Sequence, residues 1–319
     1  MGGNILKMST TRTDQLTRRA AGDNVWLSHA ADEQSSLDAL ARLEARDIRP
    51  EVLDTEEAVG RAMLDELDRL AREKEGDITI LLLGGRGAQA LHRLLGGRAK
   101  KGGDPLLPRL RVFTQDALAP MRMGSSLSFV RDFERLLGAE FFEQVKSFTS
   151  MKTDTADLEG ELTAYVRELE AAGGADIFFL GHGPEADDAS HLAYIKPGSG
   201  ATARDAAGLI PISSSILEHH ISKFKAGGSA VGEEDEAECR RSTHILTLGP
   251  AAILGAGRIV QSVVDASTAP AKKRTYRRVL ETEIADDPRE RARQLDANPG
   301  LWVRLHPGVR SLILPDVLD

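Results

Sequence analysis

Short runs of almost wholly apolar residues alternate along this chain with longer segments whose apolar residues recur every three or four positions. The short runs predict buried β-strands at 78–85, 110–117, 175–183, in the first part of 243–254, and at 257–266. The longer segments predict helices at 55–76, 125–138 and 157–174. Two further short apolar runs lie in 301–314.

Apolar strands separated by helices are typical of a parallel sheet that is covered on both faces. The predicted fold is therefore an α/β fold with a doubly wound, mostly parallel, Rossmann-like sheet. In such sheets ligands bind beyond the carboxyl ends of the strands. Four of the runs end in glycine or an acid, which predicts one shared edge for Gly84 and Gly85, Asp116, Gly181 and Gly183, and Gly249.

Composition narrows the class of protein. The chain has 319 residues, a net charge of −8 and one cysteine, Cys239. The acidic excess argues against a nucleic-acid partner, and the single cysteine fits a reducing compartment. No apolar run is long enough for a membrane helix, and the N-terminus lacks the apolar core of a secretory signal. We therefore expect a cytoplasmic protein without a membrane partner.

Two polar segments stand apart from the periodic pattern. Residues 1–24 are predicted to be a polar arm, with disorder left open, ahead of a single α/β domain at 25–319. The segment 225–242 is predicted to be an irregular charged loop, which either closes over a site or is plain surface.

The expected ligand edge carries several candidate groups. The glycines around Arg86 either cradle a phosphate ahead of a helix or form a plain tight turn. Asp116 is a candidate general base, with a helix cap or a solvated loop residue as the alternative. Lys272 and Lys273 are placed to meet an anion at a helix start, whereas Arg274, Arg277 and Arg278 are expected on a solvated helix face.

The segment 178–200 brings acids and a histidine to the same edge. Asp188 and His191 are three residues apart, with Glu185 and Asp187 nearby. The alternatives are a metal site, an acid–base role for His191, or no role. No second histidine-rich element supports a metal, since the adjacent His219 and His220 face different sides of any helix. We therefore expect neither a metal nor a cofactor.

Several stretches in this order and spacing resemble the glucosamine-6-phosphate deaminase/isomerase and 6-phosphogluconolactonase family. They are "ELTAYVRELEAAGGADIFFLGHGP", "THILTLGPAAILGAGRIVQSVVDAS" and "LWVRLHPGVRSLILPDVLD". The resemblance runs from about Val52 to the C-terminus. It implies a sugar-phosphate isomerase type of fold that binds a phosphorylated sugar without a dinucleotide, and it leaves a homo-oligomer open. It also implies that the two C-terminal apolar runs form a strand pair.

The resemblance also implies roles for individual residues. The loop formed by Gly85, Arg86, Gly87 and Ala88 corresponds to one that cradles the sugar phosphate, although its hydroxyls are replaced. Asp116 matches the base that moves a proton between C1 and C2 of the open-chain sugar. The remaining implied contacts to the phosphate or substrate come from Gly181, Gly183, Arg204, Lys223 and Lys272.

Two registers compete for the loop that carries His191. Read from "PGSG", His191 matches the ring-opening histidine of deaminases, and Lys196 replaces the glutamate that would orient it. In that register His191 lacks its carboxylate unless Asp187 or Asp188 substitutes. Read from "GHGP", Glu185 matches an acid of the lactonases and Asp187 replaces their histidine.

Three functions follow from these observations. The first is a divergent isomerase or deaminase of an (amino)hexose 6-phosphate, with Asp116 as the base and His191, assisted by Asp188, in ring opening. The second is a lactonase-type hydrolase of a phosphorylated aldonolactone. The third is a sugar-phosphate-binding sensor that has lost catalysis.

Overall fold

The computed structural model describes residues 16–30, 32–267 and 269–318. Its main sheet has seven strands, which all run parallel. In spatial order these are β3 (Glu51–Val52), β14 (Val309–Ile313), β13 (Arg258–Val263), β8 (Ile177–Leu180), β4 (Ile78–Leu82), β5 (Leu110–Thr114) and β7 (Ser147–Thr149). The prediction of an α/β fold with a parallel sheet is confirmed.

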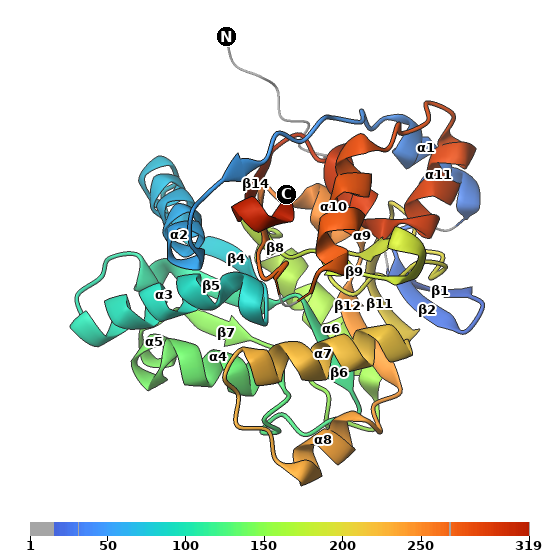
Figure 1. The fold of residues 1–319 in the computed structure, drawn as a ribbon. Helices are drawn as coiled ribbons and strands as arrows, with labels where there is room; N and C mark the ends of the chain where they lie inside the picture. The colour runs from blue at the N-terminus through green and yellow to red at the C-terminus, as the bar shows by residue number, and fades with distance from the viewer. Residues whose placement is uncertain (1–15, 31, 268, 319) are drawn as a thin grey trace.

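A second sheet, which the sequence did not predict, has five antiparallel strands. Its order is β1 (Thr17–Ala21), β2 (Asn24–Ser28), β11 (Asp205–Pro211), β12 (His244–Leu248) and β6 (Asp116–Ala119). In Figure 1, β11, β12 and β6 lie to the right of β4, β5 and β7. The chain passes from β5 to β6 through Gln115 alone, so Asp116 lies where the two sheets meet.

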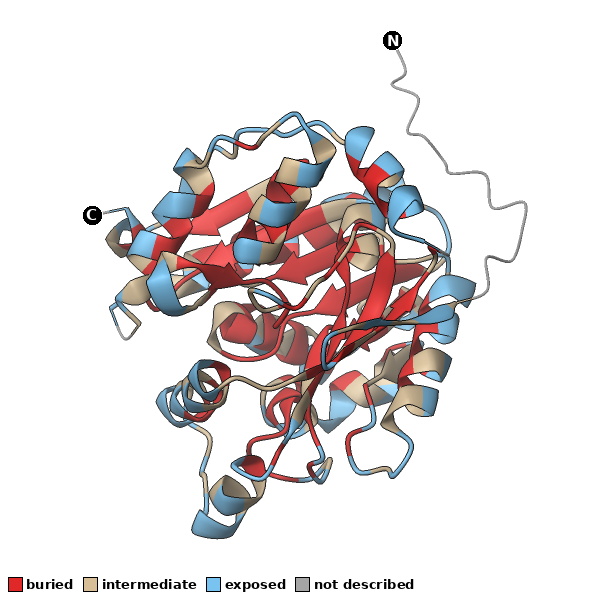
Figure 2. Cartoon of the chain, turned by 90° about the vertical axis from the view of Figure 1, so that its right-hand side faces the viewer, coloured by how far each residue is buried: buried red, intermediate tan, exposed pale blue. Residues whose placement is uncertain are grey.

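Helices surround the sheets. The α-helices are α1 (Glu33–Ala41), α2 (Glu56–Glu73), α3 (Gln89–Lys101), α4 (Phe129–Leu137), α5 (Ala139–Gln144), α6 (Leu158–Ala171), α7 (Ser214–Ala226), α8 (Glu233–Cys239), α9 (Pro250–Gly255), α10 (Ala271–Glu281) and α11 (Pro288–Ala297). Figure 2 shows the strands buried at the centre and the outer faces of the helices exposed.

The pattern of α2 and β4 explains why they form and pack. Thr55 caps α2 by accepting a hydrogen bond from the Ala58 amide. Val59, Met63 and Leu67, spaced at helical intervals, are buried. Every residue of β4 is buried, as a central parallel strand requires.

Four expectations from the sequence are corrected by the structure. The fourth predicted strand, β12, belongs to the antiparallel sheet, so Gly249 does not share the edge of β4, β5 and β8. Both faces of β12 are covered, and its apolar pattern therefore matches that of a parallel strand. Residues 299–305 form a 3₁₀-helix, so only the second C-terminal run is a strand.

The other two corrections concern the polar segments. Part of the predicted irregular loop 225–242 is the helix α8, which packs on α7 and begins with four acids, the charge that a helix N-terminus favours. Of the predicted arm, residues 1–15 lie outside the described part of the chain, but Thr17–Ala21 form a strand paired with β2.

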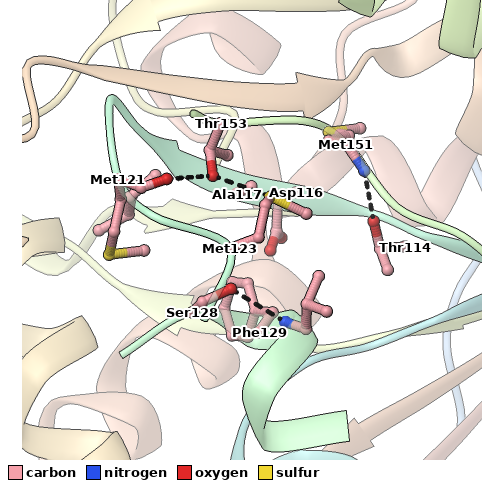
Figure 3. Close-up of a pocket in the computed structure, with 11 residues that line it drawn as sticks. Thr114, Asp116, Ala117, Met121, Met123, Ser128, Phe129, Met151 and Thr153 are labelled. Atoms are coloured by element: carbon pink, nitrogen blue, oxygen red, sulfur yellow. Dashed lines mark hydrogen bonds between the residues drawn. The ribbon is translucent and has the colours of Figure 1, made fainter. Parts of the chain in front are cut away.

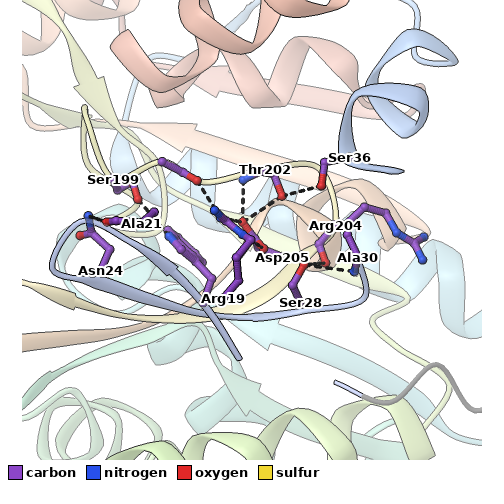
Figure 4. Close-up of polar contacts among 12 residues, drawn as sticks. Arg19, Ala21, Asn24, Ser28, Ala30, Ser36, Ser199, Thr202, Arg204 and Asp205 are labelled. Atoms are coloured by element: carbon purple, nitrogen blue, oxygen red, sulfur yellow. Dashed lines mark hydrogen bonds and ion pairs between the residues drawn. The ribbon is translucent and has the colours of Figure 1, made fainter. Parts of the chain in front are cut away.

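The hairpin of β1 and β2 supports the turn that follows the His191 loop (Figure 4). The guanidinium of Arg19 donates to Gly200 O at 2.7 Å and pairs with the fully buried carboxylate of Asp205. The indole of Trp26 donates to Ser199 O at 2.9 Å. The N-terminal hairpin thus fixes the Pro-Gly-Ser turn and, through it, one end of the loop.

Candidate active site

A cleft opens at the carboxyl ends of β4, β5 and β8. Of the residues predicted to form a site, the structure brings together Arg86, Gly87, Asp116, Gly181, Gly183, His191, Lys223 and Lys272. This is the edge where ligands bind in open parallel sheets. The lining also includes His182, Tyr194 and His219, which the sequence did not single out as site residues.

Four predicted site residues are absent from the lining of this cleft. Gly85 and Ala88 flank it in the loop after β4, and a side chain at Gly85 would meet Lys223. Arg204 donates to His29 O at 3.2 Å beside the N-terminal hairpin. Asp188 pairs with Arg274 at 2.8 Å on the surface, with 45% of its side chain exposed.

Asp116 is a buried carboxyl group with 3% of its surface exposed. It begins β6 rather than capping a helix, so that alternative is excluded. Its Oδ1 atom is buried without a hydrogen-bond partner among the described residues. Burial raises the pKa of Asp116 to about 7, and the nearby Lys223 ammonium opposes that rise. The group is thus prepared to exchange a proton near neutral pH.

A second, smaller cavity lies beside Asp116 (Figure 3). It is lined by apolar side chains that include Met121, Met123 and Met151. The hydroxyl of Thr153 donates to Met121 O at 2.6 Å, so part of the polar lining is already satisfied. This apolar surrounding contributes to the burial that favours the neutral form of the Asp116 carboxyl.

His191 is held by a carboxylate. Its Nδ1 atom lies 2.9 Å from Glu185 Oε1, and the Ser215 hydroxyl donates to Glu185 Oε2 at 2.6 Å. Since the carboxylate only accepts, Nδ1 carries the proton and Nε2 is the basic nitrogen. Burial lowers the pKa of His191, and the bond to Glu185 partly offsets this.

The contact between Glu185 and His191 joins the acid of the gap-free register to the histidine of the other register. Lys196 does replace the expected glutamate, but its ammonium turns to Pro211 O at 2.5 Å. Glu185 supplies the missing carboxylate, rather than Asp187 or Asp188. A turn with positive φ of 55° and 56° at Asp187 and Asp188 reverses the chain between the paired residues.

Gly183 is required beside this histidine. A Cβ atom at position 183 would lie 1.7 Å from His191 Nε2. The glycine of the "GHG" turn therefore provides the space that the imidazole occupies. Gly183 also pairs with His191 in the short ribbon of β9 (Gly183–Pro184) and β10 (Ser190–His191).

Three cations line the cleft, and each has an acid nearby. Lys272 is buried and pairs with Asp265, and its Nζ atom also lies 3.3 Å from Val264 O. Arg86 pairs with Glu56 at 2.8 Å. Lys223 interacts electrostatically with Asp116, and burial lowers its pKa to about 8. This arrangement suits a dianionic phosphate, which two lysines and an arginine would contact.

The neighbouring histidines are electrically neutral. Burial lowers the pKa of His219 to about 2 and that of His182 well below its ordinary value. As expected, His219 and His220 face different sides of α7, and only His219 lines the cleft. Among the described residues, no group of three or more metal-binding side chains is present, and no helix is long and apolar enough to cross a membrane.

No model of a known protein family matches the sequence. Glucosamine-6-phosphate deaminases from two strains of Porphyromonas gingivalis are 48% identical to it over 48 residues. That match spans 15% of this chain and 17% of those relatives.

Solved structures of other proteins match most of the chain. A monomeric glucosamine-6-phosphate deaminase superimposes with a TM-score of 0.63 and 17% identity, over 85% of this chain and 98% of that one. The 6-phosphogluconolactonase of Thermotoga maritima superimposes with a TM-score of 0.56 and 17% identity, over 82% of this chain and 97% of that one. The 6-phosphogluconolactonase of Trypanosoma brucei superimposes with a TM-score of 0.58 and 16% identity, over 86% of this chain and 98% of that one. The chain therefore has the fold of these two kinds of protein, as the resemblance implied.

Proposed function

We propose that the chain is an enzyme that moves protons on a phosphorylated sugar, as an isomerase or deaminase of an (amino)hexose 6-phosphate. One observation carries this proposal. Asp116, a buried carboxyl group with an oxygen that has no hydrogen-bond partner among the described residues, lines the same cleft as His191, Lys223 and Lys272, and His191 is held from behind by Glu185. Isomerisation of a cyclic sugar needs two proton-transfer groups, one for ring opening and one at C1 and C2.

The cations and the glycine loop would hold the substrate by its phosphate. Lys223 packs against Gly85, and Arg86 belongs to the same loop. Lys272 faces the cleft from α10. Binding at the phosphate end would leave the other end of the sugar for Asp116 and His191.

His191 would open the ring. Its Nε2 accepts the proton of the C1 hydroxyl and returns one to the ring oxygen, which breaks the bond between C1 and that oxygen. Glu185 holds the Nδ1 proton throughout, so the imidazole keeps the correct tautomer. The product of this step is the open-chain aldehyde.

Asp116 would then act as the base at C2. The carboxylate removes the C2 proton while the aldehyde oxygen takes up a proton from water, and it then returns the first proton to C1. When the substrate carries an amino group, the nitrogen gives up one proton to water, which leaves an imine at C2. Water adds to the imine, and ammonia leaves to give the ketose. Positioned bases of this kind contribute roughly 10²–10⁴ in rate.

The test is an assay with glucosamine 6-phosphate that follows ammonia and ketose phosphate together. We expect both to appear in equal amounts. Binding of the sugar phosphate without any product would instead support the sensor. If the protein neither binds the sugar phosphate nor forms a product, the proposal that it acts on this class of substrate is wrong.

Lactone hydrolysis is the second candidate, because a specific contact favours it. Glu185 is the residue that matches the lactonase acid in the gap-free register, and it is the residue that holds His191. His191 would take a proton from water, the hydroxide would attack the lactone carbonyl, and the ring oxygen would leave with a proton. In this reaction Asp116 moves no proton, so Asp116→Asn should retain lactonase activity but lose isomerase activity.

A further inference from the structure

A row of hydrogen bonds runs from the cleft into the core of the protein and ends on the backbone. The ammonium of Lys223 donates to the Tyr194 hydroxyl at 2.6 Å. That hydroxyl lies 2.9 Å from His220 Nδ1, and His220 Nε2 lies 2.8 Å from Leu127 O. Tyr194 and His220 have 2% and 0% of their surface exposed.

The direction of every bond in this row is determined. Leu127 O is a carbonyl and only accepts, so His220 Nε2 carries a proton. Burial lowers the pKa of His220 to about 3, so the ring is neutral and Nδ1 has only a lone pair. The Tyr194 hydroxyl must therefore donate to Nδ1. Its oxygen is left as an acceptor, and it faces the Lys223 ammonium.

The aromatic rings of Tyr194 and Phe129 also stabilise the Lys223 ammonium. Lys223 Nζ lies 4.7 Å from the centre of the Tyr194 ring and 4.9 Å from that of Phe129. Both distances are within the range of cation–π attraction. Among the described residues, Tyr194 supplies an oxygen acceptor for the ammonium, and two aromatic rings lie beside it at the edge of the cleft.

The backbone at Tyr194 supports a functional interpretation. Ala193 and Tyr194 have φ of 49° and 60°, in the left-handed region that side chains other than glycine rarely adopt. Leu192 and Ile195 bond to each other on either side of the turn, and the Thr247 hydroxyl donates to Ala193 O. The fold keeps a strained turn here and thereby directs the phenol toward Lys223.

We infer that Tyr194 and His220 form a positioning relay that keeps Lys223 charged and oriented for an anionic group of the substrate. This inference rests on the proposed function for the identity of the anion. Lys223 also faces other charged or titratable groups, namely Asp116 on β6, Asp132 on α4, Asp265 after β13, Lys272 on α10, and His219 and His191 beside the cleft. The hydrogen bond that Lys223 donates goes to Tyr194 and not to any of these groups.

Tyr194→Phe tests the relay, because it keeps the ring and removes only the hydroxyl. Without the acceptor, the ammonium form of Lys223 loses a charge-assisted hydrogen bond, and the pKa of Lys223 should fall by about one unit. The probe is a ¹³C titration of labelled lysine side chains in the full chain. The Lys223 signal is assigned by its absence in Lys223→Met.

Binding of inorganic phosphate and of glucosamine 6-phosphate, measured by calorimetry at pH 8, gives the second readout. We expect Tyr194→Phe to weaken both about fivefold, because a fall of the Lys223 pKa from about 8 by about one unit lowers the charged fraction of Lys223 at pH 8 by about that factor. In the Lys223→Met background the same change should have less than about a twofold effect, because the relay acts through Lys223. Tyr276→Phe is the matched control, since its buried hydroxyl bonds Ser311 outside the lining of the cleft.

The outcomes separate the relay from the proposed function. Wild-type protein that binds neither anion would contradict the proposed function, while the ¹³C titration would still test the relay. An unchanged Lys223 titration in Tyr194→Phe would overturn the relay, even if both anions bind. Should Tyr194→Phe fail to fold, His220→Phe keeps an aromatic ring, removes the acceptor of the Tyr194 hydroxyl and should lower the pKa of Lys223 in the same direction by a smaller amount.

Discussion

Asp116 and His191 line one cleft, yet the protein surrounds them in different ways. His191 is held by Glu185, and Glu185 in turn by Ser215. Asp116 has an oxygen without a hydrogen bond to any described residue. The imidazole is fixed in tautomer and orientation by partners, whereas the pKa of the carboxyl group is raised mainly by burial, with the Lys223 charge and the Gln115 side chain opposing the rise.

This difference fits the two proton transfers that we propose. A base that carries a proton from C2 to C1 must exchange it near neutral pH and stay open to the sugar, and strong hydrogen bonds would hold it ionised. A group that opens the ring needs one fixed lone pair. A carboxyl group whose pKa is raised mainly by burial suits the first task, and an imidazole with a hydrogen-bonded carboxylate partner suits the second.

The largest effect is expected from Asp116→Asn. The amide has the shape of the carboxyl group but does not accept the C2 proton, so kcat for isomerisation should fall about 10³-fold. The measurement is the rate of ketose phosphate formation at saturating substrate. A loss of less than about tenfold would show that another group removes the C2 proton.

The same variant should be more stable than the wild type at neutral pH. The pKa of Asp116 is higher in the folded protein than its ordinary value of 3.8, so the folded state binds the proton more tightly. Its contribution to stability is complete at low pH and is lost as the pH rises toward about 7. The difference in melting temperature between Asp116→Asn and the wild type should therefore grow in favour of the variant between pH 4 and pH 7.

On the other side of the comparison, Glu185→Gln should lower kcat/KM about 10²-fold. The amide no longer specifies the tautomer of His191, and the imidazolium loses its carboxylate. Asp188→Asn is the matched control from the same loop, because Asp188 pairs with Arg274 on the surface and should change kcat/KM less than about twofold. Equal losses in the two variants would contradict the assignment of Glu185.

Much of this site could be predicted from the sequence, because apolar runs that end in glycine or acid identify the edge of a parallel sheet. Asp116, His191 and Lys272 do lie in the cleft at that edge, and so does Lys223, which only the family resemblance implied. The antiparallel sheet could not be predicted in the same way. Its strand β12 is buried along most of its length, and an apolar run does not reveal the direction of its neighbours.

The contacts within the site were harder to predict. Glu185 meets His191 only because the chain reverses at two consecutive residues with positive φ, and Asp187 and Asp188 are not residues that require such a turn. Tyr194 lies in an apolar segment that resembles ordinary core, and its partners come from α7. Adjacent His219 and His220 on that helix were the one available signal, since one of them had to face inward.

The pH dependence sharpens the comparison further. Isomerisation should require ionised Asp116 and charged Lys223, so kcat/KM should rise through pH 7 and fall above pH 8, in accord with pKa values of about 7 and about 8. Lys223→Met should remove the falling limb and raise KM about tenfold.

Lys223→Met should also move the rising limb to higher pH, because the Lys223 ammonium lowers the pKa of Asp116. Lys225→Met, on the same helix but paired with Glu236 at the surface, should leave both limbs in place. A rising limb that does not move in Lys223→Met would show that the two groups are electrostatically independent.

The smallest effect is expected at the outer end of the His191 chain, from Ser215→Ala. The Ser215 hydroxyl bonds Glu185 Oε2 at 2.6 Å, but Ser215 is exposed, so water replaces much of the lost hydrogen bond. We expect kcat/KM to fall about threefold, with no change in the limb of the pH profile that Asp116 sets. Ser214→Ala, at an exposed position in the same helical turn, should have no effect. If Ser215→Ala instead shifted the limb of the pH profile that Asp116 sets, Asp116 and His191 would be coupled. Their separate control, by burial for Asp116 and by hydrogen-bonded partners for His191, would then be contradicted.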